Sequence, residues 1–263
     1  MNKFTHRARP RPVSQRWRSA SPQAQRGFTL IELMVAIAIA LFMTAAIIMV
    51  YLNMHRSNTS QNQISTLQEN RRLVLTFMSN TIQAAGFFPI NATDTATKTA
   101  ADVFKATSDI SPTFASGQVI AEKDLAAAGG ELGVRFQSVA GDGQLDCTGA
   151  STASATSVQV VNTYAVNASN ELTCSVNGGD PVVLASGVKS LSVLYGVDLP
   201  ETAGSEPDGS VDTWLARADV TSWSAVRTIQ IRLKFIDPLR STNSTQAEME
   251  NDLVQNINLM SSI

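Results

Sequence analysis

The stretch RGFTLIELMV, residues 26–35, places one carboxylate in an otherwise apolar run. Glu32 lies five residues past Gly27, and residues 33–52 carry no charge. A cut after Gly27 would give Phe28 a free α-amino group, a cation that Glu32 could neutralise within one helix or between packed helices. The alternative is that Glu32 lies near the membrane interface and stays hydrated, because an acid at the centre of a membrane helix is costly.

Few other residues could carry out chemistry. The two histidines are His6 and His55, so residues 91–263 contain none, which excludes Ser-His-Asp and Cys-His catalysis and His-containing metal sites there. Cys147 and Cys174 are the only cysteines, and we expect them in loops that flank strands. In an oxidising compartment a disulfide is the default, and a free thiol would lack a histidine base. We predict no catalytic residue and no cofactor.

Two acidic loops place oxygen atoms near glycines. The first is residues 142–146 and the second is Asp198–Asp212, which includes Glu201, Glu206 and Asp208. Calcium takes such ligands, but the second loop lacks the alternating Asp-x-Asp-x-Asp-Gly spacing and contains two prolines. A solvated turn is the favoured interpretation and an ion site is the alternative, so no metal site is predicted.

Charge divides the chain at its N-terminal end. Residues 1–27 hold seven Lys and Arg and no acid, whereas the remainder holds 13 basic and 22 acidic residues, a net charge of −9. The acidic body argues against nucleic acid as a partner. A basic segment directly before an apolar run is a topology signal that places the N-terminus in the cytoplasm and the body outside.

A single long helix is expected to position Glu32. The twenty uncharged residues 33–52 would span about 30 Å as a helix, the thickness of a bilayer core. No Gly or Pro occurs from residue 28 to 85, and the pattern becomes amphipathic after the membrane segment. Poor helix formers at 57–60 predict fraying or a bend, and Gly86 and Pro89 end the helix. The expected buried stripe is Ile64, Leu67, Val74, Met78 and Ile82.

The rest of the chain is predicted to be rich in β-strands. In residues 226–235 apolar and polar side chains alternate, as in an antiparallel sheet with one face covered by a helix, here the soluble half of the long helix. Residues 92–117 are predicted to form a surface loop or a partly mobile segment, and Trp214 and Trp223 to pack in the core or at an edge. The fold class is therefore α+β. Strands are expected at 132–138, 157–166, 171–176, 181–185, 188–195 and 226–235.

Residues 26–33 resemble the type III signal of type IV prepilins, with a basic leader ending in glycine, phenylalanine at the mature first position and glutamate at the fifth. The resemblance implies that a prepilin peptidase cuts between Gly27 and Phe28 and methylates the new amine. It also implies that Glu32 pairs with Phe28 of a neighbouring subunit during assembly. The leader, residues 1–27, is longer than most in the family.

Three further segments resemble the PilW minor pilins: residues 67–72, 82–87 and 187–198. In that family the helix usually ends in an Asp-Ile-Arg-like triplet, whereas this chain has Asn80-Thr81-Ile82-Gln83, which removes a possible ion pair. The resemblance implies a pilin-like fold. Its expected parts are a cleaved leader (1–27), a transmembrane half of the helix (28–52), a periplasmic amphipathic half (53–88) and a β-rich head (89–263).

The function implied by this resemblance is that of a minor pilin. Such a protein is anchored in the inner membrane with its head in the periplasm, and then joins the pilus fibre at its tip. The implied partners are other minor and major pilins, a tip adhesin, the prepilin peptidase and the inner-membrane assembly platform. The implied role is to prime assembly and support twitching motility or adhesion. The alternatives are a minor pseudopilin of a type II secretion system and, from another class, a membrane-anchored periplasmic enzyme or binding module.

Overall fold

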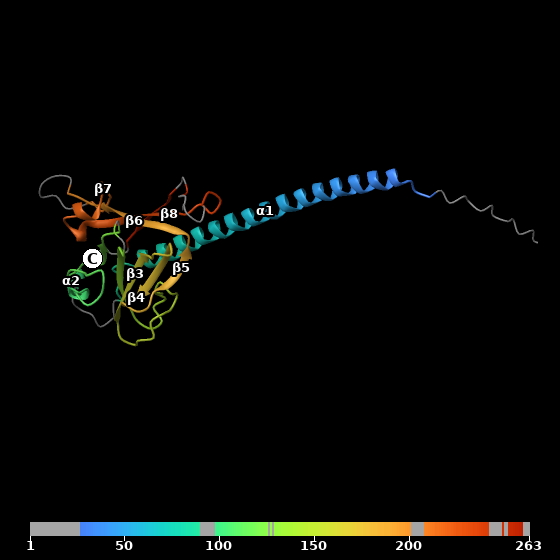
Figure 1. Cartoon of the computed structure of the whole chain (residues 1–263). Helices are drawn as coiled ribbons and strands as arrows, with labels where there is room; N and C mark the ends of the chain where they lie inside the picture. Colours follow the sequence, from blue (N-terminus) through green and yellow to red (C-terminus); the bar gives the residue numbers. More distant parts are fainter. Residues whose placement is uncertain are drawn as a thin grey trace, which may run out of the picture. The chain divides into compact units, whose positions relative to one another are not determined.

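The fold is described from a computed structural model of the chain (Figure 1). It divides into two compact units, Met1–Arg56 and Ser57–Ile263. The predicted leader, apart from Gly27, lies outside the described residues. These are residues 27–89, 98–125, 127, 129–200, 208–241, 249 and 252–259.

The long helix α1 runs from Leu30 to Gln83 without interruption. The fraying expected at residues 57–60 is not found, because these residues are helical. Each poor helix former lowers helix stability by only about 0.5 kcal/mol. Because the helix continues on both sides of these residues, it does not have to be nucleated again there. Gly86, with a φ of +79°, follows the last turn and ends the helix as expected.

The soluble part of α1 buries one stripe. Leu67, Val74, Met78 and Ile82 are buried as predicted, but Ile64 is 37% exposed. Ile64 lies one turn before the first buried position of the stripe, so the buried contact of the helix begins later than the periodicity indicated. Within the second unit α1 therefore contributes its last five turns to the core.

The head contains two antiparallel sheets rather than one. The five-stranded sheet has the order β1-β2-β3-β4-β5 and the four-stranded sheet the order β7-β6-β8-β9. The strands are β1 Ile120–Lys123, β2 Glu131–Ser138, β3 Val158–Val166, β4 Glu171–Val176, β5 Val182–Ser186, β6 Val188–Val197, β7 Thr213–Leu215, β8 Val226–Phe235 and β9 Leu253–Asn258.

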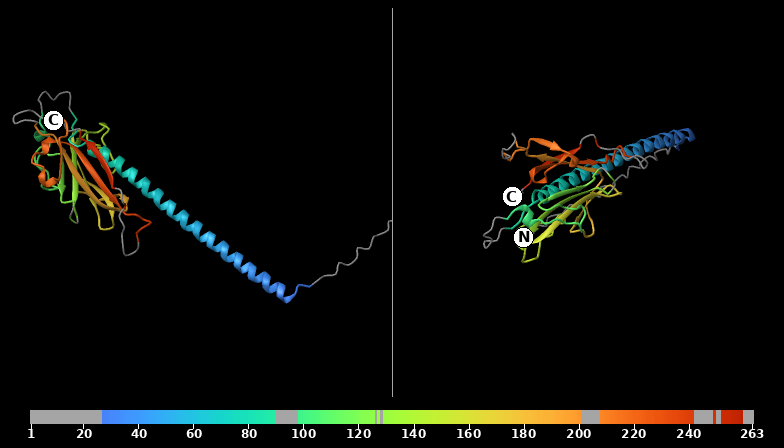
Figure 2. Two further views of the ribbon diagram at one scale, coloured as in Figure 1. Left: turned by 90° about the horizontal axis from the view of Figure 1, so that it is seen from above. Right: turned by 90° about the vertical axis from the view of Figure 1, so that its left-hand side faces the viewer.

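The chain changes sheet at Gly187, the one residue between β5 and β6. Gly187 has a φ of +78°, a conformation that residues with a Cβ rarely adopt. Its carbonyl accepts a hydrogen bond from Ile236 N after β8 (2.8 Å), while the next residue, Val188, donates to Asn170 O before β4 (2.9 Å). This turn separates the sheets, and the residues of α1 from Leu67 onward pack between them (Figure 2).

The predicted alternation in β8 is confirmed, since Ile229, Ile231, Leu233 and Phe235 are all buried. The described part of the predicted surface loop, residues 98–117, is mostly exposed as expected, but it is not irregular throughout. Residues 98–117 include helix α2 (Ala100–Val103) and an isolated bridge between Thr107 and Phe114. Phe104 is fully buried and Phe114 is 2% exposed, so this segment packs on the head instead of standing away from it.

Candidate assembly site

The Gly27–Phe28 bond lies in a non-helical stretch directly before α1. Phe28 is 83% exposed, and the helix begins at Leu30. Thr29 closes the first turn: its carbonyl accepts hydrogen bonds from Glu32 N (3.1 Å) and Leu33 N (3.2 Å), and its Oγ1 lies 3.4 Å from Glu32 N. A peptidase that cuts after Gly27 would therefore find an accessible, non-helical bond, and the cut would leave two residues before the helix.

Glu32 occupies the first turn of α1. A carboxylate there is favoured by the partial positive charge of the helix N-terminus, and Thr-x-x-Glu is the sequence of a capping box. Phe28 precedes the helix, and Glu32 lies four residues after Phe28. The structure therefore places both residue types of the predicted pair at one end of α1. The local capping role and the pairing role are compatible, because a carboxylate accepts several hydrogen bonds.

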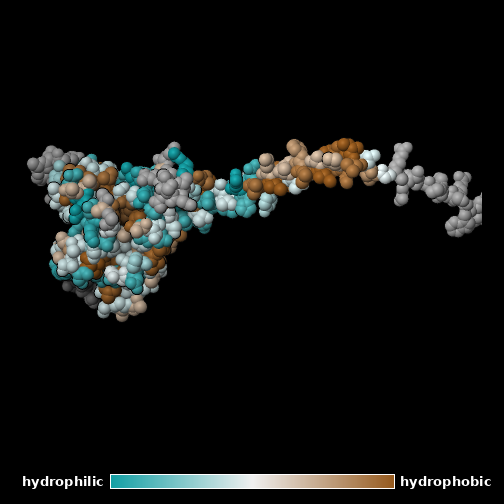
Figure 3. Space-filling model, viewed as in Figure 1, coloured by the Kyte–Doolittle hydropathy of each residue, from teal (hydrophilic) through white to brown (hydrophobic). Residues whose placement is uncertain are grey.

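The helix behind this signal is apolar on all sides. From Phe28 to Met54 its large apolar side chains are each at least 47% exposed. By length and composition α1 qualifies as a membrane span. In Figure 3 the hydrophobic colour gathers on this part of the helix. An apolar surface of this extent requires lipid or packed neighbouring helices, which agrees with an inner-membrane anchor.

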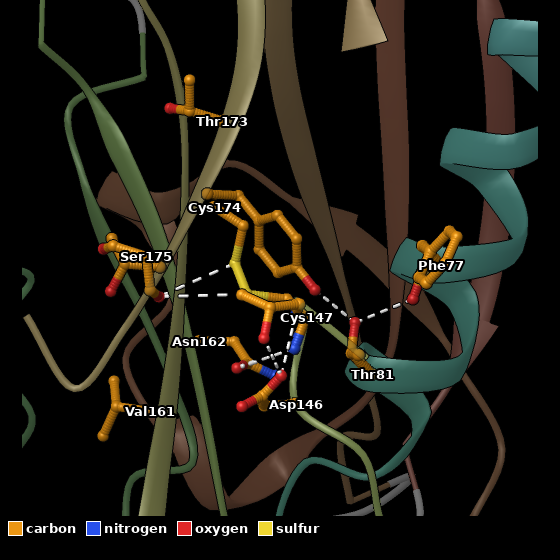
Figure 4. The surroundings of a disulfide bond; sticks show 12 residues. Phe77, Thr81, Asp146, Cys147, Val161, Asn162, Thr173, Cys174 and Ser175 are labelled. Carbon is orange, nitrogen blue, oxygen red and sulfur yellow. Dashed lines mark hydrogen bonds between the residues drawn. A yellow bond between two sulfur atoms is a disulfide. The ribbon is translucent and has the colours of Figure 1, made fainter. Parts of the chain in front are cut away.

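The structure joins Cys147 to Cys174 in a disulfide (Figure 4). Cys147 lies in the loop after β2, as expected, but Cys174 lies within β4 rather than in a flanking loop. Both are buried, and Cys147 N donates to Asn162 Oδ1 (3.2 Å). The bridge fastens the loop between β2 and β3 to strand β4 of the five-stranded sheet.

Beside the disulfide, α1 contacts the same sheet through a polar pair. The Thr81 hydroxyl is hydrogen-bonded to the Tyr164 hydroxyl, and Tyr164 lies opposite Cys174 in the strand register. Burial raises the pKa of Tyr164, and the charge of Asp146 adds to this, whereas the Thr81 hydrogen bond acts in the opposite direction. The bridge therefore lies where the loop, the sheet and the end of α1 meet.

Replacing Cys147 and Cys174 together with serine is expected to lower the free energy of unfolding by about 3 kcal/mol, because the 27-residue separation leaves a long loop unconstrained in the unfolded chain. Urea unfolding of the full chain in detergent, with and without reductant, measures this. The reductant should lower the free energy of unfolding of the wild type to that of the double variant, and should not change that of the variant. Two reactive thiols in the unreduced wild type would contradict the bridge.

Arg135 on β2 is a buried cation that the sequence did not reveal. It is 0% exposed, and burial lowers its pKa to about 10. Its guanidinium lies over the rings of Phe104 (5.4 Å) and Phe114 (4.7 Å), and among the described residues no carboxylate forms an ion pair with it. It donates to the carbonyls of Gln118 (2.6 Å), Lys105 (2.6 Å), Ala115 (2.8 Å) and Phe104 (3.3 Å), and to Gln159 Oε1 (3.4 Å).

Four of these five acceptors belong to residues 104–118, so Arg135 fastens that segment to the face of the sheet opposite α1. Gly133, two residues earlier on the same face, permits the close approach: a Cβ there would lie 2.7 Å from Pro112 Cγ and 2.8 Å from Phe114 Cζ. The available signal in the sequence was a glycine and an arginine at alternate positions among the apolar residues at the centre of β2.

The two sheets are joined at Glu122 of β1. Its carboxylate accepts a hydrogen bond from the Tyr195 hydroxyl of β6 (2.7 Å), and its carbonyl accepts one from Arg217 Nε (2.6 Å). Trp223 packs edge-on against Tyr195, with ring centroids 5.0 Å apart, in agreement with the predicted packing role. Burial, with a smaller contribution from Glu122, raises the pKa of Tyr195.

In both acidic loops, carboxylates of the described residues accept hydrogen bonds from the protein itself. In the first, the Asp142 carboxylate accepts from Val139 N and Gln144 N. In the second, buried Asp198 binds Arg227 Nε (3.0 Å) and Gly209 N (3.0 Å), and Asp212 accepts from Leu199 N (2.7 Å). Glu201 and Glu206 lie outside the described residues. Within the described part of the chain no three His, Cys, Asp or Glu side chains are grouped as metal ligands.

Comparison with known families gives two matches. Residues 22–48 match the prokaryotic N-terminal methylation motif, and residues 151–258 match the family described as type IV pilus-assembly protein W. No curated protein matches the chain. An apolar N-terminal helix with a methylation motif, followed by an antiparallel β head, defines the class of type IV pilin-like proteins. Within that class the chain is a PilW-like type IV pilin, and the family matched by its head is one of pilus assembly, not of enzymes.

Proposed function

We propose that the chain is cut between Gly27 and Phe28 by the prepilin peptidase, that the new amine is methylated, and that Glu32 neutralises the Phe28 amine of a neighbouring subunit in the fibre. The observation that carries this proposal is the position of the signal. An exposed Gly27–Phe28 bond lies two residues before an apolar helix whose first turn holds the acid. The matched methylation motif covers both residues.

The proposed role is that of a minor pilin which joins other minor and major pilins at the fibre tip, with a tip adhesin. It would prime assembly on the inner-membrane platform and thereby support twitching motility or attachment. Packing and charge pairing, not catalysis, would be its mechanism. The match of the head to a pilus-assembly family favours this role over a type II secretion pseudopilin, and genes for pilus or secretion components beside this one would separate the two.

Mass spectrometry of the mature N-terminus tests the proposal. Protein recovered from sheared fibres should begin with N-methylated Phe28, because the cut frees that amine. A Gly27→Val variant should keep its leader and stay in the membrane fraction, since a branched side chain replaces the glycine at the cut. Recovery of assembled protein that retains residues 1–27 would contradict processing and assembly by this route.

A further inference from the structure

A cleft of about 580 Å³ lies in the head, where strand β1 meets the segment before it and the 3₁₀-helices η1 (Arg217–Asp219) and η2 (Trp223–Ala225). Sites for small molecules commonly have volumes of about 300–1,000 Å³. The lining comes from residues 111–118, from Ala121–Asp124, and from Arg217 and Trp223. The cleft therefore lies entirely within the second unit, apart from the processing signal and the apolar half of α1.

The side of the cleft formed by Arg217 and Trp223 is held by contacts with β1 and β6. Arg217 Nε donates to the Glu122 carbonyl (2.6 Å). Trp223 packs against Tyr195, whose hydroxyl donates to Glu122 Oε2 (2.7 Å). Groups that are already fixed lose little conformational entropy when a ligand binds.

The side formed by residues 111–118 is held by the buried Arg135. Two of the carbonyls that accept from Arg135, those of Ala115 and Gln118, belong to residues that line the cleft. Gln118 Oε1 in turn accepts from Ala115 N (2.9 Å), which orients the side-chain amide. Among the described residues nothing accepts from Gln118 Nε2, so its two N–H groups remain for a ligand.

The formal charge of the lining is balanced. It contains two acids, Glu122 and Asp124, and two bases, Lys123 and Arg217. Lys123 also pairs with Glu131 (3.7 Å). A phosphate or carboxylate ligand would need surplus positive charge, and an ammonium ligand would need surplus negative charge. The balance favours an uncharged polar ligand.

The lining offers donors, acceptors and an aromatic ring together. Within the described part of the chain, Glu122 Oε1 and the terminal nitrogens of Arg217 have no hydrogen-bond partner. Thr113 adds an exposed hydroxyl, and Trp223 adds a partly exposed indole with an apolar face. A sugar matches this set, because its hydroxyl groups both donate and accept and its C–H groups form an apolar face.

We propose that this cleft binds a neutral saccharide. Hydroxyl groups of the sugar would donate to Glu122 Oε1 and accept from Arg217 and the Gln118 amide. The C–H face of the sugar would pack on the Trp223 ring. The inference goes beyond the proposed function, because assembly through Glu32 does not require the cleft.

A glycan array tests the proposal with the full-length chain in a detergent that has no sugar headgroup. The array carries neutral hexoses, N-acetylhexosamines, uronic acids, bacterial cell-wall glycan strands and oligosaccharides from animal cell surfaces. The chain should bind glycans that contain neutral rings. Binding to the cell-wall strands would identify a ligand of the envelope, and binding to the animal oligosaccharides an external one. Binding to uronic acids alone, or to no glycan, would overturn the proposal.

Two substitutions in the lining make the test specific. Arg217→Met and Glu122→Gln should each weaken binding of the best array glycan by about tenfold or more, because hydrogen bonds to a charged group are lost. Glutamine at 122 still offers an acceptor to the Tyr195 hydroxyl. Arg72→Met, at an exposed arginine of α1, is the matched control and should bind like the wild type. All three variants should unfold at the temperature of the wild type, and equal binding by the cleft variants and the control would overturn the proposal.

Photolabelling locates the ligand without any substitution. A diazirine derivative of the best-binding sugar should attach to the wild-type chain within residues 111–124 or 217–223, and the unlabelled sugar should displace it. Attachment elsewhere in the chain would overturn the assignment of the cleft. None of these measurements uses fibres, so a failure of processing or assembly would contradict the proposed function and leave the saccharide site unaffected.

Discussion

Replacing Glu32 with alanine is expected to remove the protein from assembled fibres while its head stays folded. In a fibre the N-terminal amine and the carboxylate would be surrounded by the apolar helix surfaces that are exposed in a single chain. Loss of one partner of a buried ion pair leaves the other charge uncompensated and costs about 3–5 kcal/mol. That corresponds to a fall of about two to four orders of magnitude in the association constant. Immunoblots of sheared fibres and of membranes measure the distribution.

Two variants make this experiment specific. Glu69→Ala removes an exposed acid from the same helix within the second unit and should assemble like the wild type. Glu32→Gln separates the two roles of Glu32, because glutamine can serve in a capping box but cannot neutralise an amine. If the glutamine variant fails to assemble, the negative charge of Glu32 is required, and its hydrogen bonding alone is not sufficient. Normal assembly of both Glu32 variants would favour a hydrated acid at the membrane edge.

The long helix and the alternating strand β8 were predictable because their signals are local. Helical periodicity and the absence of Gly and Pro extend over residues 28–85, and the alternation of residues 226–235 is decided by one buried face. The processing signal is equally local, because a peptidase and a helix terminus both depend on consecutive residues. In the structure the processing signal lies directly before α1, where the sequence predicted it.

The division into two sheets was not predictable from such patterns. It depends on Gly187, which looks like any turn glycine, and on pairings between strands far apart in the chain. The short strands β1 and β7 and the late strand β9 were missed because each is too brief or too polar to show a clear period. Val182 and Val183 were predicted as part of a strand, but the exposure of that strand at an edge depends on which strands pair.

Arg135 illustrates the same limit, and it carries the largest expected effect on stability. Replacing it with methionine is expected to lower the free energy of unfolding by about 3–5 kcal/mol, since a buried hydrogen-bonded network is broken. Urea unfolding of the mature chain in detergent, followed by the fluorescence of Trp214 and Trp223, measures the change. Arg72→Met is the matched control, because Arg72 is exposed on α1, and it should change stability by less than about 0.5 kcal/mol.

A buried charge can often be replaced by an apolar residue at little cost, because its desolvation penalty is removed at the same time. Arg135 differs in that four of its acceptors are backbone carbonyls, which no substitution can remove. Methionine would fill the space between Phe104 and Phe114 but would remove the donor to the Lys105 and Gln118 carbonyls, at about 1–3 kcal/mol for each that water cannot reach. The Phe104 and Ala115 carbonyls would keep their backbone donors, Gly117 N and Gln118 N. Arg135→Lys keeps the charge but has three donors on one atom, so it should also be destabilised. A lysine variant as stable as the wild type would show that the positive charge alone holds the 104–118 segment. A methionine variant as stable as the wild type would show that water replaces the guanidinium as the donor.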